Sequence, residues 1–267
     1  MRGVCMRKNI IAANWKMNYG PVKAVEYFEE LIALLKNEND VLASVKEGKT
    51  SIELYVPSIS LQSSVNAVKG LDYPVKIGAE NINAELSGAF TGEISATMLK
   101  EISINDTIIG HSERRHIYNE SNADLNKKVH TAINEGLNVV YCVGELLEDR
   151  TSGKTIDVVK EQIVEGLKDI KEAEMNNICI AYEPVWAIGT GKTASSEDAQ
   201  EVCCEIRRII SDIYSAEVSE KLHILYGGSV KPNNTKELLT QNDIDGLLIG
   251  GASLKPEVYT EILKNSL

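Results

Sequence analysis

Short apolar runs rich in β-branched residues alternate with amphipathic helical patterns along the whole chain of 267 residues. Near-continuous hydrophobic strands separated by helices are typical of a parallel sheet that is buried on both faces. Eight runs have the length of strands, and we expect strands at 10–13, 52–56, 75–79, 107–110, 138–143, 178–182, 223–226 and 246–249. The helical patterns between them include 22–35, 123–135, 158–170, 197–214 and 236–240.

The segment 158–170 shows how these helical patterns are recognised. Its apolar residues recur at helical spacing and predict one stripe that packs against the sheet, with charged residues on the opposite side. The predicted stripe consists of Val159, Ile163, Val164, Leu167 and Ile170.

Eight strand–helix units within about 250 residues favour a closed (β/α)8 barrel. The alternative for the same pattern is an open, doubly wound sheet. No low-complexity or Pro/Gly-rich linker divides the chain, so we expect a single α/β domain that covers residues 1–267. The polar stretch 37–50 is interpreted as a long connection between a helix and a strand.

The charge balance excludes some classes of partner. Lys and Arg total 28 against 39 Asp and Glu, a net charge of −11, which argues against binding to nucleic acid or to an anionic membrane. The five cysteines form an odd set without framework spacing, which predicts reduced thiols and a cytoplasmic location. No apolar run is long enough for a signal peptide or a membrane span.

Polar side chains follow several of the predicted strands, where a barrel carries its catalytic groups. Asn14 and Lys16 alternate after the first strand and so share one side of the chain, where an amide and a cation can stabilise a developing oxyanion. His111 precedes Ser112 and Glu113, which open the next helix. Because a helix start disfavours the imidazolium, we expect a neutral histidine that donates a hydrogen bond to a carbonyl.

Glu183 ends a very apolar strand and is followed by Pro184. A proline holds the preceding residue in an extended conformation, and a carboxylate fixed in this way suits a general base. A salt-bridged residue at the barrel rim is the alternative interpretation of Glu183.

The Gly-Lys-Thr triplet at 191–193 suggests a P-loop, but that motif needs a glycine at the position of Trp186, so we reject it. The segment instead has a stiff entry, a tip of small residues and a short exit, as a rigid lid with two hinges would have. The predicted lid contains Pro184, Val185, Trp186, Ala187, Ile188, Gly189, Thr190, Gly191, Lys192, Thr193 and Ala194.

Paired glycines follow the last two predicted strands, at 227–228 and 250–251. A glycine pair alone often marks only a tight turn. Two pairs after consecutive final strands favour a phosphate site, because the loops after strands seven and eight of such barrels commonly bind phosphate through backbone N–H groups.

Taken together, five motifs resemble the triosephosphate isomerase family, whose members are TIM barrels. They are Asn-Trp-Lys-Met-Asn at 14–18, Gly-His-Ser-Glu-Arg-Arg at 110–115, the long segment 181–193, Tyr-Gly-Gly-Ser-Val at 226–230 and Gly-Gly-Ala-Ser-Leu at 250–254. They occur in the order and spacing of that family across nearly the whole chain.

The resemblance implies a reaction: interconversion of dihydroxyacetone phosphate and D-glyceraldehyde 3-phosphate, in glycolysis and gluconeogenesis, without a cofactor or metal. It implies that Glu183 moves the proton, that neutral His111 polarises the oxygens, that Lys16 supplies positive charge and that Asn14 orients these groups. The phosphate-binding residues that it implies are Gly189, Ser229, Gly250 and Gly251, with Ser112 and Glu113 in support.

The resemblance also implies a homodimer in which a loop of one subunit reaches the active site of the other. The matching loop is 88–93, with Thr91 at its tip. Glu80 stands where many family members have glutamine, and at an interface it must be paired, protonated or energetically costly.

Two other functions stay open at this point. The first is a barrel that binds a phosphate ligand without catalysis, and the second is another phosphosugar enzyme. The presence of all three of Lys16, His111 and Glu183 argues against both.

Overall fold

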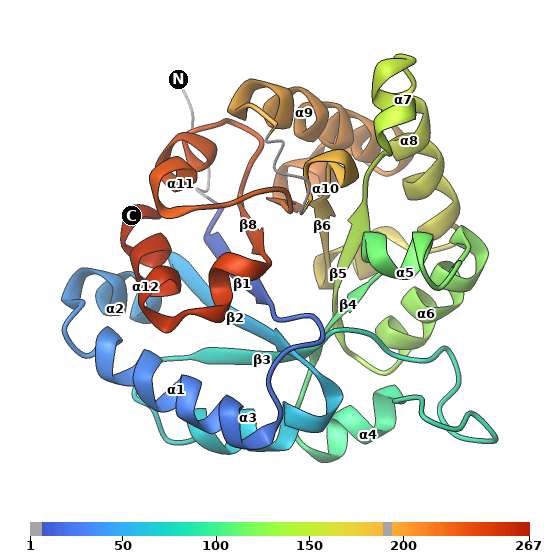
Figure 1. The fold of residues 1–267 in the computed structure, drawn as a ribbon. Coiled ribbons are helices and arrows are strands. Elements are labelled where there is room, and N and C mark those ends of the chain that lie inside the picture. Colours follow the sequence, from blue (N-terminus) through green and yellow to red (C-terminus); the bar gives the residue numbers. More distant parts are fainter. Residues whose placement is uncertain (1–6, 189–193) are drawn as a thin grey trace.

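A closed barrel of eight parallel strands forms the centre of the computed structural model, which describes residues 7–188 and 194–267 (Figure 1). Each strand pairs with the next, and β1 pairs with β8 to close the ring. The strands are β1 (Asn9–Asn14), β2 (Thr50–Val56), β3 (Val75–Ala79), β4 (Asp106–Ile109), β5 (Asn138–Val143), β6 (Ile178–Tyr182), β7 (His223–Tyr226) and β8 (Gly246–Ile249). The predicted closed barrel is confirmed, and the open sheet is wrong.

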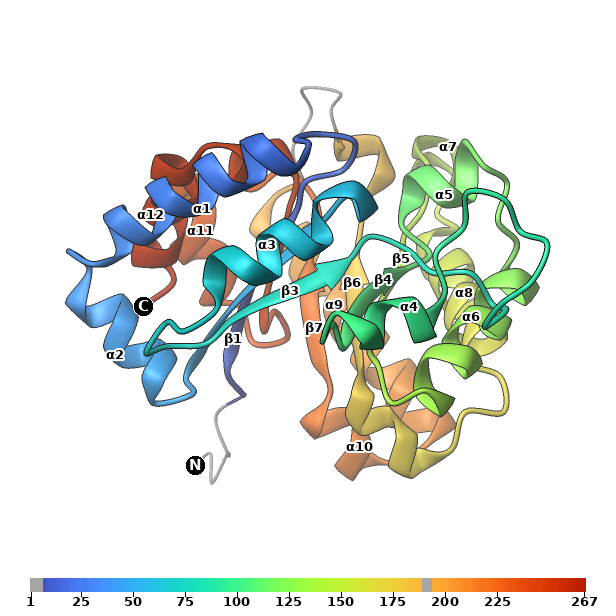
Figure 2. The same cartoon turned by 90° about the horizontal axis from the view of Figure 1, so that it is seen from below.

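Helices connect the strands and surround them (Figures 1 and 2). The α-helices are α1 (Pro21–Leu35), α2 (Asn39–Lys46), α3 (Leu61–Val68), α4 (Ala96–Glu101), α5 (Ser112–His116), α6 (Asn122–Asn134), α7 (Leu147–Thr151), α8 (Thr155–Gly166), α9 (Ser196–Ile213), α10 (Ala216–Lys221), α11 (Pro232–Leu239) and α12 (Pro256–Asn265). Short 3₁₀ turns are η1 (Ser58–Ser60), η2 (Glu172–Asn177), η3 (Val185–Ala187) and η4 (Gly251–Leu254). No helix in the described ranges is long and apolar enough to cross a membrane.

The barrel separates two hydrophobic cores because successive side chains of a strand point to opposite faces. In β1, Ile10 and Ala12 belong to the small cluster inside the barrel, whereas Ile11 and Ala13 pack outward beneath the helices. Side chains of the small cluster fill the interior of the barrel, so a ligand site is expected at an end of the barrel.

The segment 37–50 is not the long connection that its polarity suggests. It contains the helix α2, whose Val41 and Val45 are buried against the rest of the molecule. These two valines lie one helical turn apart, and the partly buried Leu42 packs beside them against the core, so a short segment with several polar residues is anchored as a helix.

The predicted stripe of 158–170 is also wrong in part. α8 ends at Gly166, and Val164 is 44% exposed, while Val159, Gln162 and Ile163 face inward. A glycine is required at 166 because any side chain there would collide with the hydroxyl of Tyr141. The buried face therefore includes one polar and one side-chain-free position, which a search for apolar residues does not find.

Candidate active site

A cavity of about 450 Å³ opens at the end of the barrel where the strands terminate. The predicted catalytic residues come to it from three strands: Asn14 and Lys16 after β1, His111 after β4, and Glu183 after β6. The loops after β7 and β8 complete the wall. They contribute Gly227, Gly228, Ser229, Val230, Lys231, Gly250, Gly251 and Ala252.

Glu183 is almost fully buried, at 2% exposure, and both of its carboxylate oxygens have partners. Oε1 lies 2.9 Å from Nε2 of His111, and Oε2 accepts a hydrogen bond from the backbone N–H of Ser112 at 2.9 Å. Burial alone would raise the pKa of this carboxyl group. The contacts with His111, the Ser112 N–H and the nearby charge of Lys16 outweigh burial and hold the pKa below its usual value.

His111 is the N-cap residue of α5, and its ring Nδ1 accepts a hydrogen bond from the backbone N–H of Glu113 at 3.2 Å. A nitrogen that accepts a hydrogen bond carries no proton, so the proton of the neutral ring resides on Nε2. This N–H is directed at Oε1 of Glu183, at the wall of the cavity.

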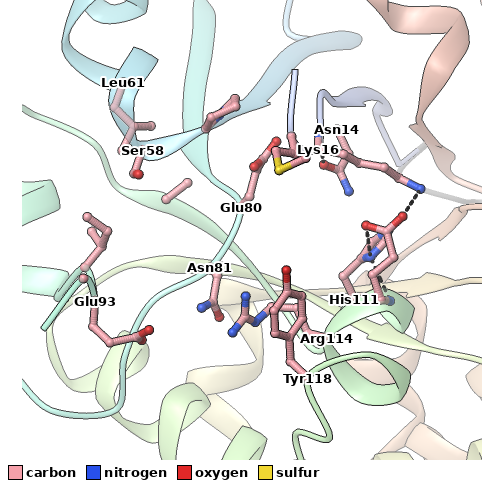
Figure 3. A pocket seen from close by; sticks show the side chains of 16 residues that line it. Asn14, Lys16, Ser58, Leu61, Glu80, Asn81, Glu93, His111, Arg114 and Tyr118 are labelled. Atoms are coloured by element: carbon pink, nitrogen blue, oxygen red, sulfur yellow. Dashed lines mark hydrogen bonds and ion pairs between the residues drawn. The ribbon is translucent and has the colours of Figure 1, made fainter. Parts of the chain in front are cut away.

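Lys16 has an uncommon backbone conformation for a lysine, with φ of 54°. The side chain of Asn14 stabilises this turn, because its Oδ1 accepts a hydrogen bond from the Lys16 N–H at 3.0 Å. The Lys16 ammonium is 2.8 Å from Oε1 of Glu113, a contact drawn in Figure 3, and its Cε lies next to Gly250. The turn thus directs a cation across the cavity.

Two glycines leave room for Glu183: Gly227, from the pair assigned above to a phosphate site, and Gly144, which the sequence analysis did not assign. A Cβ at Gly144 would lie 1.8 Å from the backbone oxygen of Glu183, and one at Gly227 would lie 2.9 Å from its Cγ. Gly144 directly follows a strand, so the rule that identified Glu183 would also have found it.

The entry to the predicted lid is anchored by Glu145, which the sequence analysis also missed. This buried carboxylate accepts hydrogen bonds from Nε1 of Trp186 at 2.8 Å and from the Tyr182 hydroxyl at 3.2 Å. The backbone N–H of Val185 donates to its carbonyl oxygen. These contacts hold the start of the lid, Pro184 to Ile188, against the barrel.

Part of the predicted lid and phosphate site falls outside the described residues. These positions are Gly189, Thr190, Gly191, Lys192 and Thr193. Ala194, at the predicted exit of the lid, packs against the hydrophobic core.

A second cavity, of about 320 Å³, adjoins the first and shares Asn14, Lys16 and His111 with it. Figure 3 shows Glu80 on the side of Lys16, with Arg114 and Tyr118 across the opening. Burial raises the pKa of Glu80 to about 8, although Lys16 favours its charged form. Its Oε1 is buried without a hydrogen-bond partner among the described residues.

The predicted dimer loop extends from the barrel between β3 and α4 (Figure 1). Thr91 is exposed at this loop, and Phe90 is 46% exposed. The structure therefore does not bring Thr91 into the cavity of its own chain.

The chemistry of this donor set is that of proton transfer. A carboxylate, an N–H donor and an ammonium surround one small space, which suits removal of a proton from a carbon next to a carbonyl group. Within the described ranges, no cluster of three or more His, Cys, Asp or Glu side chains is arranged to hold a metal ion.

Comparison with known proteins agrees with this geometry. A family model described as triosephosphate isomerase matches residues 9–266. Proteins named triosephosphate isomerase from Dictyoglomus thermophilum and Carboxydothermus hydrogenoformans are 47% and 45% identical, over 97% and 98% of this chain and 100% of each protein. The one from Fusobacterium nucleatum is 44% identical, over 97% of this chain and 99% of its own. The chain therefore belongs to the triosephosphate isomerase family.

Proposed function

We propose that this protein interconverts dihydroxyacetone phosphate and D-glyceraldehyde 3-phosphate through an enediolate intermediate. The observation that carries the proposal is the buried pair of Glu183 and His111, 2.9 Å apart, in a cavity that Lys16 also lines. A carboxylate next to a neutral N–H donor and a cation is the set of groups that the isomerisation needs.

In this mechanism Glu183 takes a proton from C1 of dihydroxyacetone phosphate. The electron pair of that C–H bond forms the C1–C2 double bond, and negative charge develops on the carbonyl oxygen. Nε2–H of His111 and the Lys16 ammonium stabilise this charge. Return of the proton to C2, with transfer of a hydroxyl proton through His111, gives the aldehyde.

The resting position of Glu183 requires a movement before this step. Both carboxylate oxygens are already bonded, to His111 and to the Ser112 N–H. Substrate must therefore take over the hydrogen bond of His111, and the carboxylate must swing toward the cavity. The side-chain-free position at Gly227, beside the Glu183 Cγ, leaves space for that swing.

The phosphate group is proposed to bind between the loops after β7 and β8. Ser229, Gly250 and Gly251 line this part of the cavity, and Gly251 begins the turn η4. Backbone N–H groups at the start of a helical turn have no partners within the turn and attract anions. Gly189 and the lid from Pro184 to Ala194 would close over the phosphate and exclude water from the enediolate.

Replacement of Glu183 by aspartate tests the assignment of the base. The shorter side chain withdraws the carboxylate by one methylene, and such misplacement costs on the order of 10²-fold in turnover. Coupled turnover of glyceraldehyde 3-phosphate by Glu183→Asp is compared with wild type and with Glu220→Asp, a shortening at a side chain that is 68% exposed. Equal turnover of all three would refute Glu183 as the base. Absence of turnover in the folded wild type would instead favour a barrel that only binds a phosphate ligand.

We also propose a homodimer in which the loop 88–93 enters the second cavity of a partner copy. Exposed apolar side chains on and around that cavity support it, with Met17 at 96% and Tyr118 at 64% exposure. Sedimentation in dilute solution should show a dimer, and a stable monomer would refute this arrangement.

Free thiols at the four described cysteines favour a cytoplasmic location.

A further inference from the structure

The cavity of about 450 Å³ that Glu183 lines has little unpaired positive charge to attract an anionic substrate. Glu183 is a buried carboxylate, and Lys16 is engaged with Glu113 at 2.8 Å. The one other lysine that lines this cavity in the described structure is Lys231. It forms no ion pair with a carboxylate of the described residues, and it is exposed at the cavity edge.

We propose that Lys231 attracts and retains the phosphate of the substrate at the mouth of the site. This proposal rests on the proposed function, which supplies a phosphate that is largely dianionic. A chain with a net charge of −11 repels such an anion as a whole. A lone cation next to Ser229 and Gly228 offsets that repulsion where the phosphate enters.

The side-chain ammonium of Lys231 takes no part in the hydrogen bonds by which this residue caps α11. Lys231 is the N-cap residue of α11, where its N–H donates to Oδ1 of Asn234 and its carbonyl oxygen accepts from the Thr235 hydroxyl. Both bonds use backbone atoms of Lys231. A glutamine at this position therefore removes the charge and leaves the start of the helix intact.

The expected size of the effect follows from Coulomb's law. A dianion at roughly 8 Å from one positive charge in water is favoured about fourfold at 10 mM ionic strength. Screening reduces this to about 1.3-fold at 0.5 M ionic strength. The effect belongs to substrate capture, so it should appear in kcat/KM and KM, and kcat should change little.

The experiment compares Lys231→Gln with Lys236→Gln, which removes the same charge from an exposed position on α11 that does not line the cavity. We measure kcat and KM for glyceraldehyde 3-phosphate from 10 mM to 0.5 M ionic strength, and the inhibition constant of inorganic phosphate. Lys231→Gln should lower kcat/KM about fourfold at 10 mM and raise the phosphate inhibition constant by a similar factor. Both differences should fade at 0.5 M, and Lys236→Gln should follow the wild type.

Three results would overturn the proposal. They are an equal effect of the two substitutions, an effect of Lys231→Gln that does not depend on salt, and a loss that falls on kcat alone. In each of these cases turnover by the wild type would still stand, so failure of this proposal is distinguishable from failure of the proposed function.

Discussion

Glu80→Gln should raise the free energy of unfolding by an amount that grows with pH. The carboxyl group lines the second cavity, its Oε1 has no partner among the described residues, and burial raises its pKa to about 8. Glutamine has nearly the same shape and carries no charge. The substitution therefore removes the cost of ionising a buried acid with little change in packing.

The sign and size follow from proton linkage. The pKa in the folded state lies above its usual value of 4.5, so the folded state keeps a proton that the unfolded state releases. Below pH 4.5 the carboxyl group is protonated in both states, and its contribution to the free energy of unfolding is fully present. As pH rises from there through pH 8, ionisation favours the unfolded state and this contribution is lost. Glu80→Gln removes this penalty and should therefore raise the free energy of unfolding by about 1 kcal/mol at pH 5 and about 3 kcal/mol at pH 7.

Calorimetric melts and urea denaturation at pH 5, 6, 7 and 8 measure this dependence at fixed protein concentration. At about 2 °C per kcal/mol for a chain of this size, Tm should rise by about 6 °C at pH 7. Glu85→Gln is the control, because it removes a charge from an exposed position on the same loop.

The pH dependence of the stability gain distinguishes ionisation of Glu80 from an effect of packing. A gain that is equal at pH 5 and pH 8 would show that better packing, and not the proton, is responsible. An unchanged or lower Tm at neutral pH would refute the reasoning altogether.

Two further predictions concern the support of the barrel. Gly144→Ala should lower turnover on the order of 10²-fold and lower the free energy of unfolding by about 1–3 kcal/mol, because its Cβ would displace the Glu183 backbone. Gly20→Ala, with open space at its Cβ, is the control. Equal kinetics of the two variants would contradict the prediction. Asp245→Ala should cost about 3–5 kcal/mol in urea denaturation, because it removes the carboxylate that Arg207 and Arg7 share, at 2.7 and 2.6 Å, and leaves the buried Ile224 N–H without its acceptor. Glu220→Ala, which breaks an exposed pair with Arg7, should cost less than about 1 kcal/mol, and a similar loss in both variants would argue against a special effect of burial.

The strands were predicted closely because their signal is local. β3, β5, β6, β7 and β8 have the expected bounds, since each is a short apolar run that ends at a polar or glycine residue. The helices depend more on their neighbours. α2 is anchored by the burial of Val41 and Val45, and the glycine at position 166 of α8 is required by Tyr141, a residue on another element.

The candidate site divides in the same way. Asn14, Lys16, His111 and Glu183 follow strands, so topology alone brings them to one end of the barrel. The partners that set their states could not be predicted, because these depend on side-chain geometry. Only the three-dimensional structure shows that the Ser112 N–H donates to the Glu183 carboxylate and that the Glu113 N–H fixes the His111 tautomer.

The occupied carboxylate of Glu183 has a consequence for how binding energy is used. Freeing it breaks two hydrogen bonds to a charged group, each typically worth about 1.5–3 kcal/mol. Contacts with the remote phosphate can drive that release, whereas a triose that lacks the phosphate has little with which to do so. If Glu183 is the base, as proposed, its carboxylate stays hydrogen-bonded until a phosphorylated substrate binds, and discrimination against other trioses occurs when that carboxylate is released.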